Sequence, residues 1–401
     1  MDKLAIKRGQ ADTQTETLAV LPRHQRLFIG VPREVTVQEN RVALVPHSVA
    51  SLVAHGHDVV VEAGAGEKAS ITDMEYSEAG ARIAHQTEEV YKADVLLKVA
   101  PPTHAEIDMM RPNQVLISPI HLPLIDAEYI TRLQKKRVIA LAMEYLRDDE
   151  TGIFPIVHVM SEIAGISAVL IAADLLATVR GGKGVLLGGI AGVPPAKIII
   201  LGAGIVAQFA TRTALGLGAE VRIFDNNVHK LMRLQNQVGR QLYTSIINPM
   251  HLKEELINAD VAIGAIHSAQ ASSPMVVPED IVRQMKPGSV IVDVSIDQGG
   301  CFETSKATTH DKPTFTKHDV VHYCVPNIPS RVARTASDAI SNILATMLLK
   351  AESGGILSLI TSHEGLRKGV YTYKGCLTNV YIGERFQLKS TNLDLLITSD
   401  Y

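Results

Sequence analysis

The chain contains no tryptophan, and aromatic residues make up only 4% of its 401 positions. Its three cysteines, Cys301, Cys324 and Cys376, are far apart and form no C-x-x-C pair, which excludes a disulfide framework and a zinc site of the usual spacing. Excess charge is also absent, because the formal net charge is only −3. Neither a nucleic acid nor an anionic membrane is therefore expected as a partner.

Long apolar runs are not expected either, since glycine, proline or a charged residue interrupts each run before it reaches the length of a membrane span. Residues 1–26 carry mixed charges and no apolar core of the kind found in signal peptides. We expect residues 1–26 to be a polar N-terminal extension and the protein to be cytoplasmic. The remaining composition, with 46% hydrophobic residues and 29 glycines, is typical of a soluble α/β protein.

A dinucleotide-binding pattern occupies residues 197–227, KIIILGAGIVAQFATRTALGLGAEVRIFDNN. An apolar strand leads into G-x-G-x-x-A, formed by Gly202, Gly204 and Ala207, and a helical run and a second strand follow, ending in Asp225. A strand, a tight turn, a helix, a strand and an acidic residue in about thirty positions is the context that the dinucleotide fingerprint requires. A glycine triplet alone would be no more than an ordinary strand-to-helix turn. The complete unit predicts that the centre of the chain binds NAD(H).

Each part of this unit has a physical role. Gly202 permits a tight turn, Gly204 lets the backbone approach a pyrophosphate, and Ala207 lets the helix pack on the strand. The phosphates would lie at the N-terminus of the helix, where free N–H groups point outward. Asp225 favours NAD over NADP, because a carboxylate hydrogen-bonds ribose hydroxyls and repels a 2′-phosphate.

Strand-like and helix-like segments alternate along most of the chain, which indicates parallel sheets. Polar residues follow three of the predicted strands: His121, Asp297 and Asn327. In doubly wound sheets the ligand crevice lies beyond the carboxyl ends of the strands, so these side chains are candidates to reach a nicotinamide and its substrate. Any one of them alone is more often a turn former. Long helices are expected from Ser161 onward and over 337–351. Residues 365–386 are too polar to be predicted as a core strand and are expected to pack as an arm.

Blocks along the chain from about Ile29 to its end resemble the alanine dehydrogenase family, which also contains the NAD-binding α subunit of proton-translocating transhydrogenase. The resemblance is carried by IGVPREV, ENRVALVP, GHDVVVEAGAGEKASITD, DVLLKV, MSEIAG, GVLLGGIAGVPPAK, LGAGIVA, KPGSVIVDVSIDQGGCFET and VVHYCVPNIP. It implies an α/β fold of two Rossmann-like, doubly wound parallel-sheet domains with the active-site cleft between them. Residues 27–152 plus 333–401 would form a substrate domain and residues 153–332 an NAD-binding domain, in a homo-oligomer, either a hexamer or a dimer.

The family's reaction is the reversible, NAD-dependent oxidative deamination of L-alanine to pyruvate and ammonia. By motif match, Arg41 would bind the substrate carboxylate through its two-pronged guanidinium, and His121 and Asp297 would be catalytic. The resemblance also assigns contacts with NAD to residues beyond the fingerprint. The predicted cofactor contacts are Ser161, Gly202, Ala203, Gly204, Ala207, Asp225, Lys230, Ile266 and Asn327. No metal ligand is expected.

The chain departs from the family pattern at three places. Where alanine dehydrogenases read K-V-K-E-P this chain reads K-V-A-P-P, so the second lysine, which binds the substrate oxygen, is replaced by Ala100. Lys98 is two positions earlier on the same strand face, and one hypothesis is that it partly substitutes; the other is that it is structural. The V-P-G after I-G-A is replaced by His267, Ser268 and Ala269, and a later G-A-V-P is replaced by residues 330–333, S-R-V-A.

Besides a close relative of alanine dehydrogenase that acts on another small 2-oxo or 2-amino acid, two other functions remain open at this stage. The transhydrogenase α subunit also lacks the second lysine, which keeps hydride exchange between dinucleotides as an alternative. That subunit normally lacks the histidine and carries an Arg, Gln and Asp loop that is not found after Glu144, so His121 favours the dehydrogenase. The loss of the lysine at Ala100 motivates the second alternative, a catalytically weak NAD-binding regulator.

Overall fold

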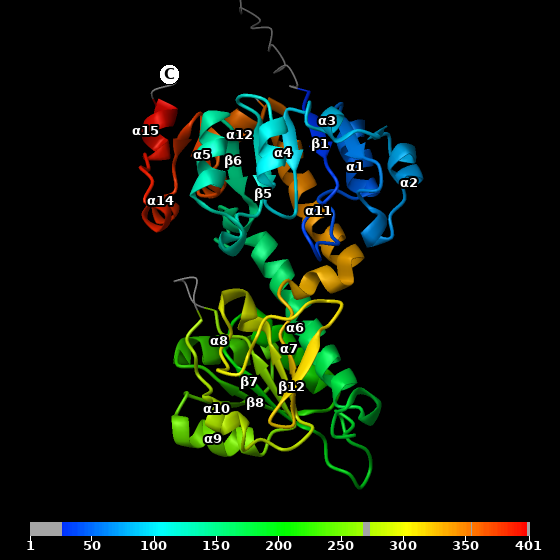
Figure 1. Ribbon diagram of the computed structural model, residues 1–401, viewed down its shortest axis with the longest axis vertical. Helices are drawn as coiled ribbons and strands as arrows, with labels where there is room; N and C mark the ends of the chain where they lie inside the picture. The colour runs from blue at the N-terminus through cyan, green and yellow to red at the C-terminus, as the bar shows by residue number, and fades with distance from the viewer. Residues whose placement is uncertain (1–25, 268–272, 354, 399–401) are drawn as a thin grey trace, which may run out of the picture.

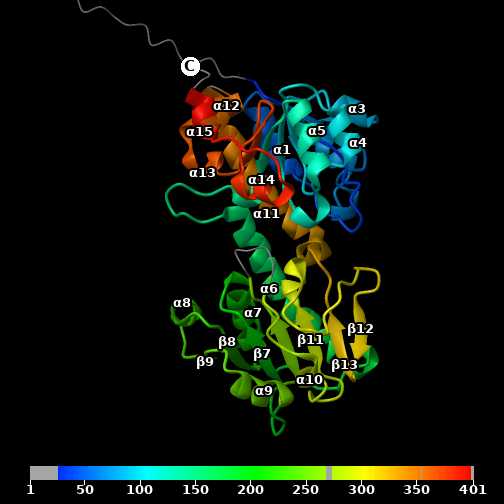
Figure 2. The same cartoon turned by 60° about the vertical axis from the view of Figure 1, so that its left-hand side comes forward.

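A computed structural model describes residues 26–267, 273–353 and 355–398. Outside the described residues lie residues 1–25 of the expected N-terminal extension and the last three residues. Residues 268 and 269, where the chain departs from the family's V-P-G, also lie outside them. The described residues form two α/β lobes, one above the other in Figure 1, and the same division is seen in Figure 2.

The first lobe is built on an eight-stranded sheet in the order β15-β14-β6-β5-β4-β1-β2-β3. Its strands are β1 (Phe28–Val31), β2 (Asp58–Glu62), β3 (Arg82–Ala84), β4 (Val95–Leu97), β5 (Val115–Ser118), β6 (Ile139–Ala142), β14 (Val370–Tyr373) and β15 (Cys376–Leu377). Strands β1 to β6 are parallel, whereas β14 and β15 are antiparallel to their neighbours. Its helices are α1 (Pro46–Ala54), α2 (Asp73–Glu78), α3 (Thr87–Val90), α4 (His104–Met109), α5 (Ala127–Lys135), α11 (Ala333–Leu349), α12 (Gly355–Ser362), α13 (Glu364–Arg367), α14 (Val380–Phe386) and α15 (Leu393–Thr398).

The second lobe is built on a seven-stranded sheet in the order β12-β13-β11-β10-β7-β8-β9, in which only β12 is antiparallel to its neighbour. Its strands are β7 (Lys197–Leu201), β8 (Glu220–Phe224), β9 (Tyr243–Ser245), β10 (Val261–Gly264), β11 (Val290–Asp293), β12 (Thr314–Lys317) and β13 (Val320–Tyr323). Its helices are α7 (Ile205–Gly216), α8 (Val228–Val238), α9 (Pro249–Ile257) and α10 (Glu279–Val282), and α6 (Pro155–Leu175) leads into it from the first lobe.

Both sheets are buried on two faces, which is why their strands read as continuous aliphatic runs. In β4, Val95 and Leu97 belong to one apolar cluster and Leu96 to another on the opposite face. In β7, Ile198 and Ile199 divide in the same way between the two clusters of the second lobe. The predicted fold class, two doubly wound α/β domains, is confirmed.

Helix α6 begins at Pro155, six residues before the predicted start, because proline at the first helical position has its φ angle already set for a helix. The expectation that no apolar run reaches spanning length was wrong here, since α6 is long and apolar enough by length and composition to cross a membrane. Half of that stretch is buried inside the fold, where α6 packs on α7 and α11. Its apolar character is therefore explained by its position as a core helix.

The C-terminal segment is not an outlying arm. Strand β14 pairs with β6 and is buried at all four positions, and Tyr371 donates or accepts a hydrogen bond at 3.0 Å with Tyr129 of α5. The expectation of an arm was wrong because the two tyrosines satisfy each other's hydroxyl groups, so a polar-looking strand is buried without loss of hydrogen bonds.

The contact between α6 and α7 requires glycine at position 165. A Cβ atom added to Gly165 would lie 2.4 Å from the carbonyl oxygen of Val206, so Gly165→Ala must push the helices apart. We expect this change to lower the free energy of unfolding by about 1–3 kcal/mol, measured by urea denaturation. The control is Gly216→Ala in α7, where a Cβ meets nothing within 4 Å, and which should stabilise by up to about 1 kcal/mol. Equal effects of the two changes would contradict this account of the packing.

Candidate active site

The fingerprint turn has the geometry that its glycines predict. Gly202 has φ +110, and a Cβ there would lie 2.4 Å from the carbonyl oxygen of Ala265, so only glycine is accommodated. Gly204 faces open space and has no side chain to cap α7, whereas Ala207 is completely buried. The first N–H groups of α7 are therefore available to an anion that approaches Gly204.

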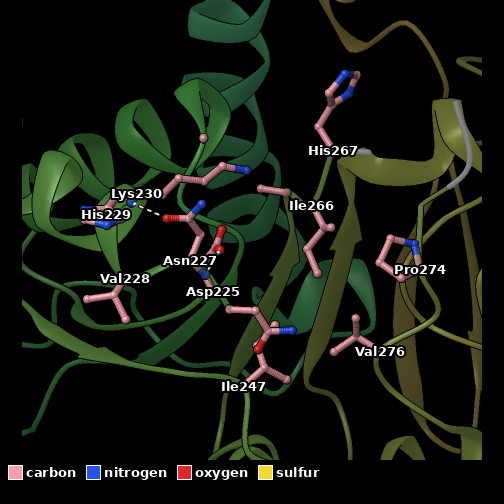
Figure 3. Close-up of a pocket in the computed structure, with 13 residues that line it drawn as sticks. Asp225, Asn227, Val228, His229, Lys230, Ile247, Ile266, His267, Pro274 and Val276 are labelled. Carbon is pink, nitrogen blue, oxygen red and sulfur yellow. Dashed lines mark hydrogen bonds between the residues drawn. The ribbon is translucent and has the colours of Figure 1, made fainter. Parts of the chain in front are cut away.

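A pocket of about 650 Å³ opens beside this turn (Figure 3). It is lined by Gly204, Asp225, Asn226, Asn227, Val228, His229, Lys230, Ile247, Ala265, Ile266, His267, Pro274 and Val276. Asp225 accepts hydrogen bonds from the N–H groups of Ala203 and Asn227, both at 2.7 Å. Its carboxylate is thereby fixed at the end of β8, with lone pairs left for further donors.

Lys230 and Ile266 line the same pocket from opposite sides, and each is held by its backbone. The N–H group of Lys230 donates to the side chain of Asn227, which caps α8, at 3.1 Å. The N–H group of Ile266 donates to Ser295 Oγ at 2.9 Å. Ser295 belongs to the 3₁₀ helix η5 (Val294–Gln298), which also carries Asp297. This short helix therefore links the pocket to a second group of polar side chains.

The second group contains Arg41, His121, Asp297 and Asn327. His121 follows β5 with φ 38, and its N–H group and that of Ile120 point toward Glu144 Oε1, at 3.4 and 2.8 Å. Asp297 Oδ1 accepts the N–H group of Asn327 at 3.0 Å. Arg41 and Asn327 both donate to Glu39, Asn327 also donates to Asp297, and the charges of Asp297 and Arg41 act on the pKa of His121, so these side chains form one group.

One buried carboxylate, that of Glu39, joins this group together. It accepts hydrogen bonds from Arg41 Nε at 2.7 Å and Nη2 at 2.6 Å, and from Asn327 Nδ2 at 2.9 Å. Arg41 belongs to the segment after β1 in the first lobe, and Asn327 follows β13 in the second. Glu39 thus connects the two lobes inside the site. Nε and Nη2 of Arg41 therefore both donate to Glu39, and this edge of the guanidinium faces Glu39.

Burial sets the protonation of the two candidate catalytic groups. Burial lowers the pKa of His121 below its ordinary value, although the charge of Asp297 opposes that shift. Burial raises the pKa of Asp297, against the N–H group of Asn327 and the charges of His121 and Arg41. His121 is therefore neutral at pH 7 and able to accept a proton.

Lys98 is not presented to this group, in contrast to the hypothesis that it substitutes for the missing lysine. Its side chain is completely buried, and its ammonium nitrogen lies 2.9 Å from both Glu34 and Glu106. These carboxylates outweigh the effect of burial and raise the pKa of Lys98. Ala100, where the family has its second lysine, is also buried and contributes only a methyl group. The geometry supports the structural interpretation of Lys98.

Ser161 is the remaining predicted residue, and it is half-buried on α6, one position after Met160, whose sulfur lies 3.3 Å from Arg41 Nη1. Three acids in or beside the site were missed from the sequence: Glu39, Glu144 and Asp293. Asp293 is completely buried and accepts N–H groups of Ser295 and Cys301 and the hydroxyl of Ser305, which folds the loop that carries Asp297. Only Glu39 had a visible signal, because it precedes Arg41 by two residues in the same motif.

Comparisons with known proteins place this geometry in a family. Residues 30–164 match the N-terminal domain, and residues 168–380 the C-terminal domain, of the family described as alanine dehydrogenase/PNT. The chain belongs to the alanine dehydrogenase/PNT family. It is 39% identical over 368 residues to alanine dehydrogenase 2 of Staphylococcus aureus (strain USA300), covering 91% of this chain and 98% of that protein.

Solved structures of the alanine dehydrogenase/PNT family agree with this assignment. An L-alanine dehydrogenase superposes with a TM-score of 0.84 at 38% identity, over 90% of this chain and 99% of that one. A transhydrogenase from Sinorhizobium meliloti superposes less well, with a TM-score of 0.74 at 28% identity, over 87% of this chain and 98% of that one. The dehydrogenase is thus the nearer of these two structures in both fold and sequence.

The pair formed by Glu39 and Arg41 should contribute to stability in a pH-dependent way. Although burial opposes it, the charge and hydrogen bonds of Arg41 lower the pKa of Glu39 below its ordinary 4.5. The stabilisation is then present above pH 4.5 and is lost as the pH falls through the lowered pKa. We expect Glu39→Gln to cost about 3–5 kcal/mol at pH 7, measured by urea denaturation, and less below pH 4.5.

The matched control is Glu128→Gln, which removes an exposed carboxylate paired with Arg132 on the same helix. Its cost should stay below about 1 kcal/mol, because surface pairs are screened by water. A Glu39→Gln effect that is equally small, or that is independent of pH, would contradict the assigned role of the buried pair.

Proposed function

We propose that this protein is an NAD-dependent alanine dehydrogenase, which catalyses the reversible oxidative deamination of L-alanine to pyruvate and ammonia. The observation that carries the proposal is the hydrogen-bonded series from Arg41 through Glu39 and Asn327 to Asp297, with His121 near enough to respond to their charges, in a chain that has a complete dinucleotide-binding turn. Membership of the alanine dehydrogenase/PNT family supports the same conclusion.

The residues around the fingerprint fit NAD. The open space at Gly204 and the free N–H groups of α7 suit a pyrophosphate, and Asp225 suits the ribose hydroxyls of the adenosine. Lys230 and Ile266 would line the same site, with Ser161 and Asn327 toward the reacting end. When bound, NAD supplies the acceptor and donor of hydride, and the chemistry of proton transfer is left to the protein.

The substrate would lie among the second group of side chains. Arg41 would bind the substrate carboxylate through the N–H groups that Glu39 leaves free, near Met160. Neutral His121 would accept a proton during alanine oxidation and return it during the reverse reaction. Asp297 would hold the attacking water or the leaving ammonia. Lys98 would act indirectly, by fixing Glu34 close enough to influence Arg41.

In this proposal residues 27–152 plus 333–401 form the substrate domain and residues 153–332 the NAD-binding domain. The protein would be cytoplasmic and would take only small molecules as ligands: alanine, pyruvate and ammonium. We also propose a homo-oligomer, either a hexamer or a dimer. The loop after α6 supports this last point, because it exposes Val179, Leu186, Ile190 and Val193 to solvent although all four are aliphatic.

The enzymatic proposal is tested by following NADH oxidation with pyruvate and ammonium. Because a general acid–base group typically contributes about 10²–10⁴-fold, His121→Ala should lose activity by that factor, whereas His55→Ala, which removes an exposed histidine, should retain it. In the direction of alanine oxidation, kcat/KM should rise with pH through an apparent pKa below 6.5, since burial lowers the pKa of His121.

Two results would overturn the proposal. NADH binding without turnover of any 2-oxo acid would identify a catalytically weak NAD-binding protein, in keeping with Ala100. Hydride exchange between two dinucleotides in the absence of pyruvate would identify a transhydrogenase-like protein. Each result corresponds to one of the alternatives that the sequence leaves open.

The oligomer is tested by sedimentation of the purified protein. Val179 is 91% exposed, and we expect Val179→Asp to shift the assembly toward smaller species, since it would place a charge in the proposed contact between copies. The control is Met74→Asp, on α2 of the first lobe, which is 68% exposed and should leave the assembly unchanged. A wild-type protein that sediments as a monomer would contradict the proposed homo-oligomer.

A further inference from the structure

The segment that carries Glu39 and Arg41 has no regular structure. It lies between β1 and α1, and Gln38 within it has a left-handed φ of 67. Backbone N–H groups in such a buried segment need partners that no sheet or helix supplies. The N–H groups of Glu39 and Arg41 find partners within the segment, whereas three others are bonded to side chains that lie about 290 positions later in the sequence.

Three buried serines provide those partners. The N–H group of Asn40 donates to Ser330 Oγ, that of Val42 to Ser337 Oγ and that of Val45 to Ser341 Oγ, each at 2.9 Å. Ser337 and Ser341 are four residues apart on one face of α11, and Ser330 precedes them in the 3₁₀ helix η6 (Ile328–Val332). All three serines are at most 1% exposed. These serines form a ladder that fixes the path of the segment.

Ser330 differs from the other two because it binds the segment on both sides of Glu39. Its hydroxyl donates to the carbonyl oxygen of Gln38 at 2.7 Å, and its own carbonyl accepts from Asn40 Nδ2 at 3.3 Å. Gln38 Oε1 receives a further bond from the N–H group of His310, at 3.2 Å. The residues before and after Glu39 are therefore both held by the chain that follows Asn327.

The bonds close a ring around the site. Glu39 accepts from Asn327, Asn327 precedes Ser330 by three residues, and Ser330 returns to the neighbours of Glu39. The ring fixes the position of the Glu39 carboxylate relative to the Asn327 loop. Because Arg41 donates to that carboxylate, the ring also fixes the orientation of the Arg41 guanidinium. Ser330 is also the first residue of S-R-V-A, which replaces the G-A-V-P of alanine dehydrogenases, and glycine has no hydroxyl with which to close the ring.

We propose that Ser330 is a positioning residue, whose hydroxyl holds residues 38–40 against the Asn327 loop and thereby aims Arg41 at the substrate carboxylate. The inference deepens the proposed function and rests on it, because it assigns the substrate to Arg41. This device suits a chain in which Ala100 contributes no cation, since the orientation of Arg41 then decides how well a carboxylate is bound.

The test compares Ser330→Ala with Ser341→Ala in the full-length protein. Both changes remove one buried hydroxyl that accepts one N–H group at 2.9 Å, but Ser341 binds Val45, beyond residues 38–40, and only Ser330→Ala also removes the bond to the carbonyl oxygen of Gln38. Hydrogen–deuterium exchange of the peptide that spans residues 36–42 should quicken by about tenfold at Asn40 in Ser330→Ala only, because losing one hydrogen bond weakens local protection by that order. This readout does not depend on catalysis.

The kinetic readout separates positioning from general damage. Ser330→Ala should raise the KM for pyruvate by about fivefold to tenfold with kcat within about twofold of the wild type, because Arg41 binds the carboxylate in the ground state and the transition state alike. Affinity for NADH should not change. Ser330→Gly should behave in the same way, since the hydroxyl and not the Cβ makes the contact.

Several outcomes would overturn the inference. Unchanged exchange at Asn40 in Ser330→Ala would show that the hydroxyl does not hold the segment, and an equal rise in KM in Ser341→Ala would reduce Ser330 to a structural residue. An effect of Ser330→Gly without one of Ser330→Ala would assign the role to backbone stiffness. If the wild-type protein does not turn over pyruvate, the proposed function fails, and the exchange at Asn40 still decides whether Ser330 holds the segment.

Discussion

The sharing of the Glu39 carboxylate between Arg41 and Asn327 is the interaction on which the site depends. A buried guanidinium without a partner would be unstable, and a buried carboxylate would take up a proton. The pairing of Glu39 with Arg41 prevents both outcomes. The Glu39 side chain is only 4% exposed, and its pKa is nevertheless lowered by Arg41. Because its two partners come from different lobes, the same bonds that keep Arg41 charged also fix the lobes relative to each other at the site.

In the rest of the site, buried polar side chains hold backbone that has no regular secondary structure. Glu144 accepts backbone N–H groups of the left-handed turn at His121, and Asp293 accepts those of the loop that carries Asp297. Ser330 accepts a backbone N–H group of the segment that carries Arg41. Each of these three side chains replaces the hydrogen bonds that a sheet or helix would have provided. The candidate catalytic groups are therefore held in place although they lie on loops at the ends of strands.

The sequence predicts best what depends on neighbouring residues. The turn at Gly202, the strand before it and Asp225 after it lie within thirty residues, so their relation is visible in the pattern. The sequence predicts less well what depends on pairing at a distance. From the sequence Lys98 is a plausible substrate contact, whereas in the structure Glu34 and Glu106 bind its ammonium group. The polar strand of Tyr371 is a core strand because its hydroxyl pairs with that of Tyr129. The second partner of the Glu39 carboxylate, Asn327, lies 288 positions away, so the sequence pattern does not reveal it.

The charges of the site also bear on the direction of the reaction. Arg41 is the cation that faces the carboxyl groups of Glu39 and Asp297, and Ala100 adds no second one. In the proposed reaction alanine brings its own ammonium group, whereas pyruvate brings only a carboxylate. In the proposed function, binding of pyruvate would therefore favour a proton on Asp297, whose pKa burial raises. That proton would be available to the reduction, which consumes one proton overall when pyruvate, ammonium and NADH give alanine.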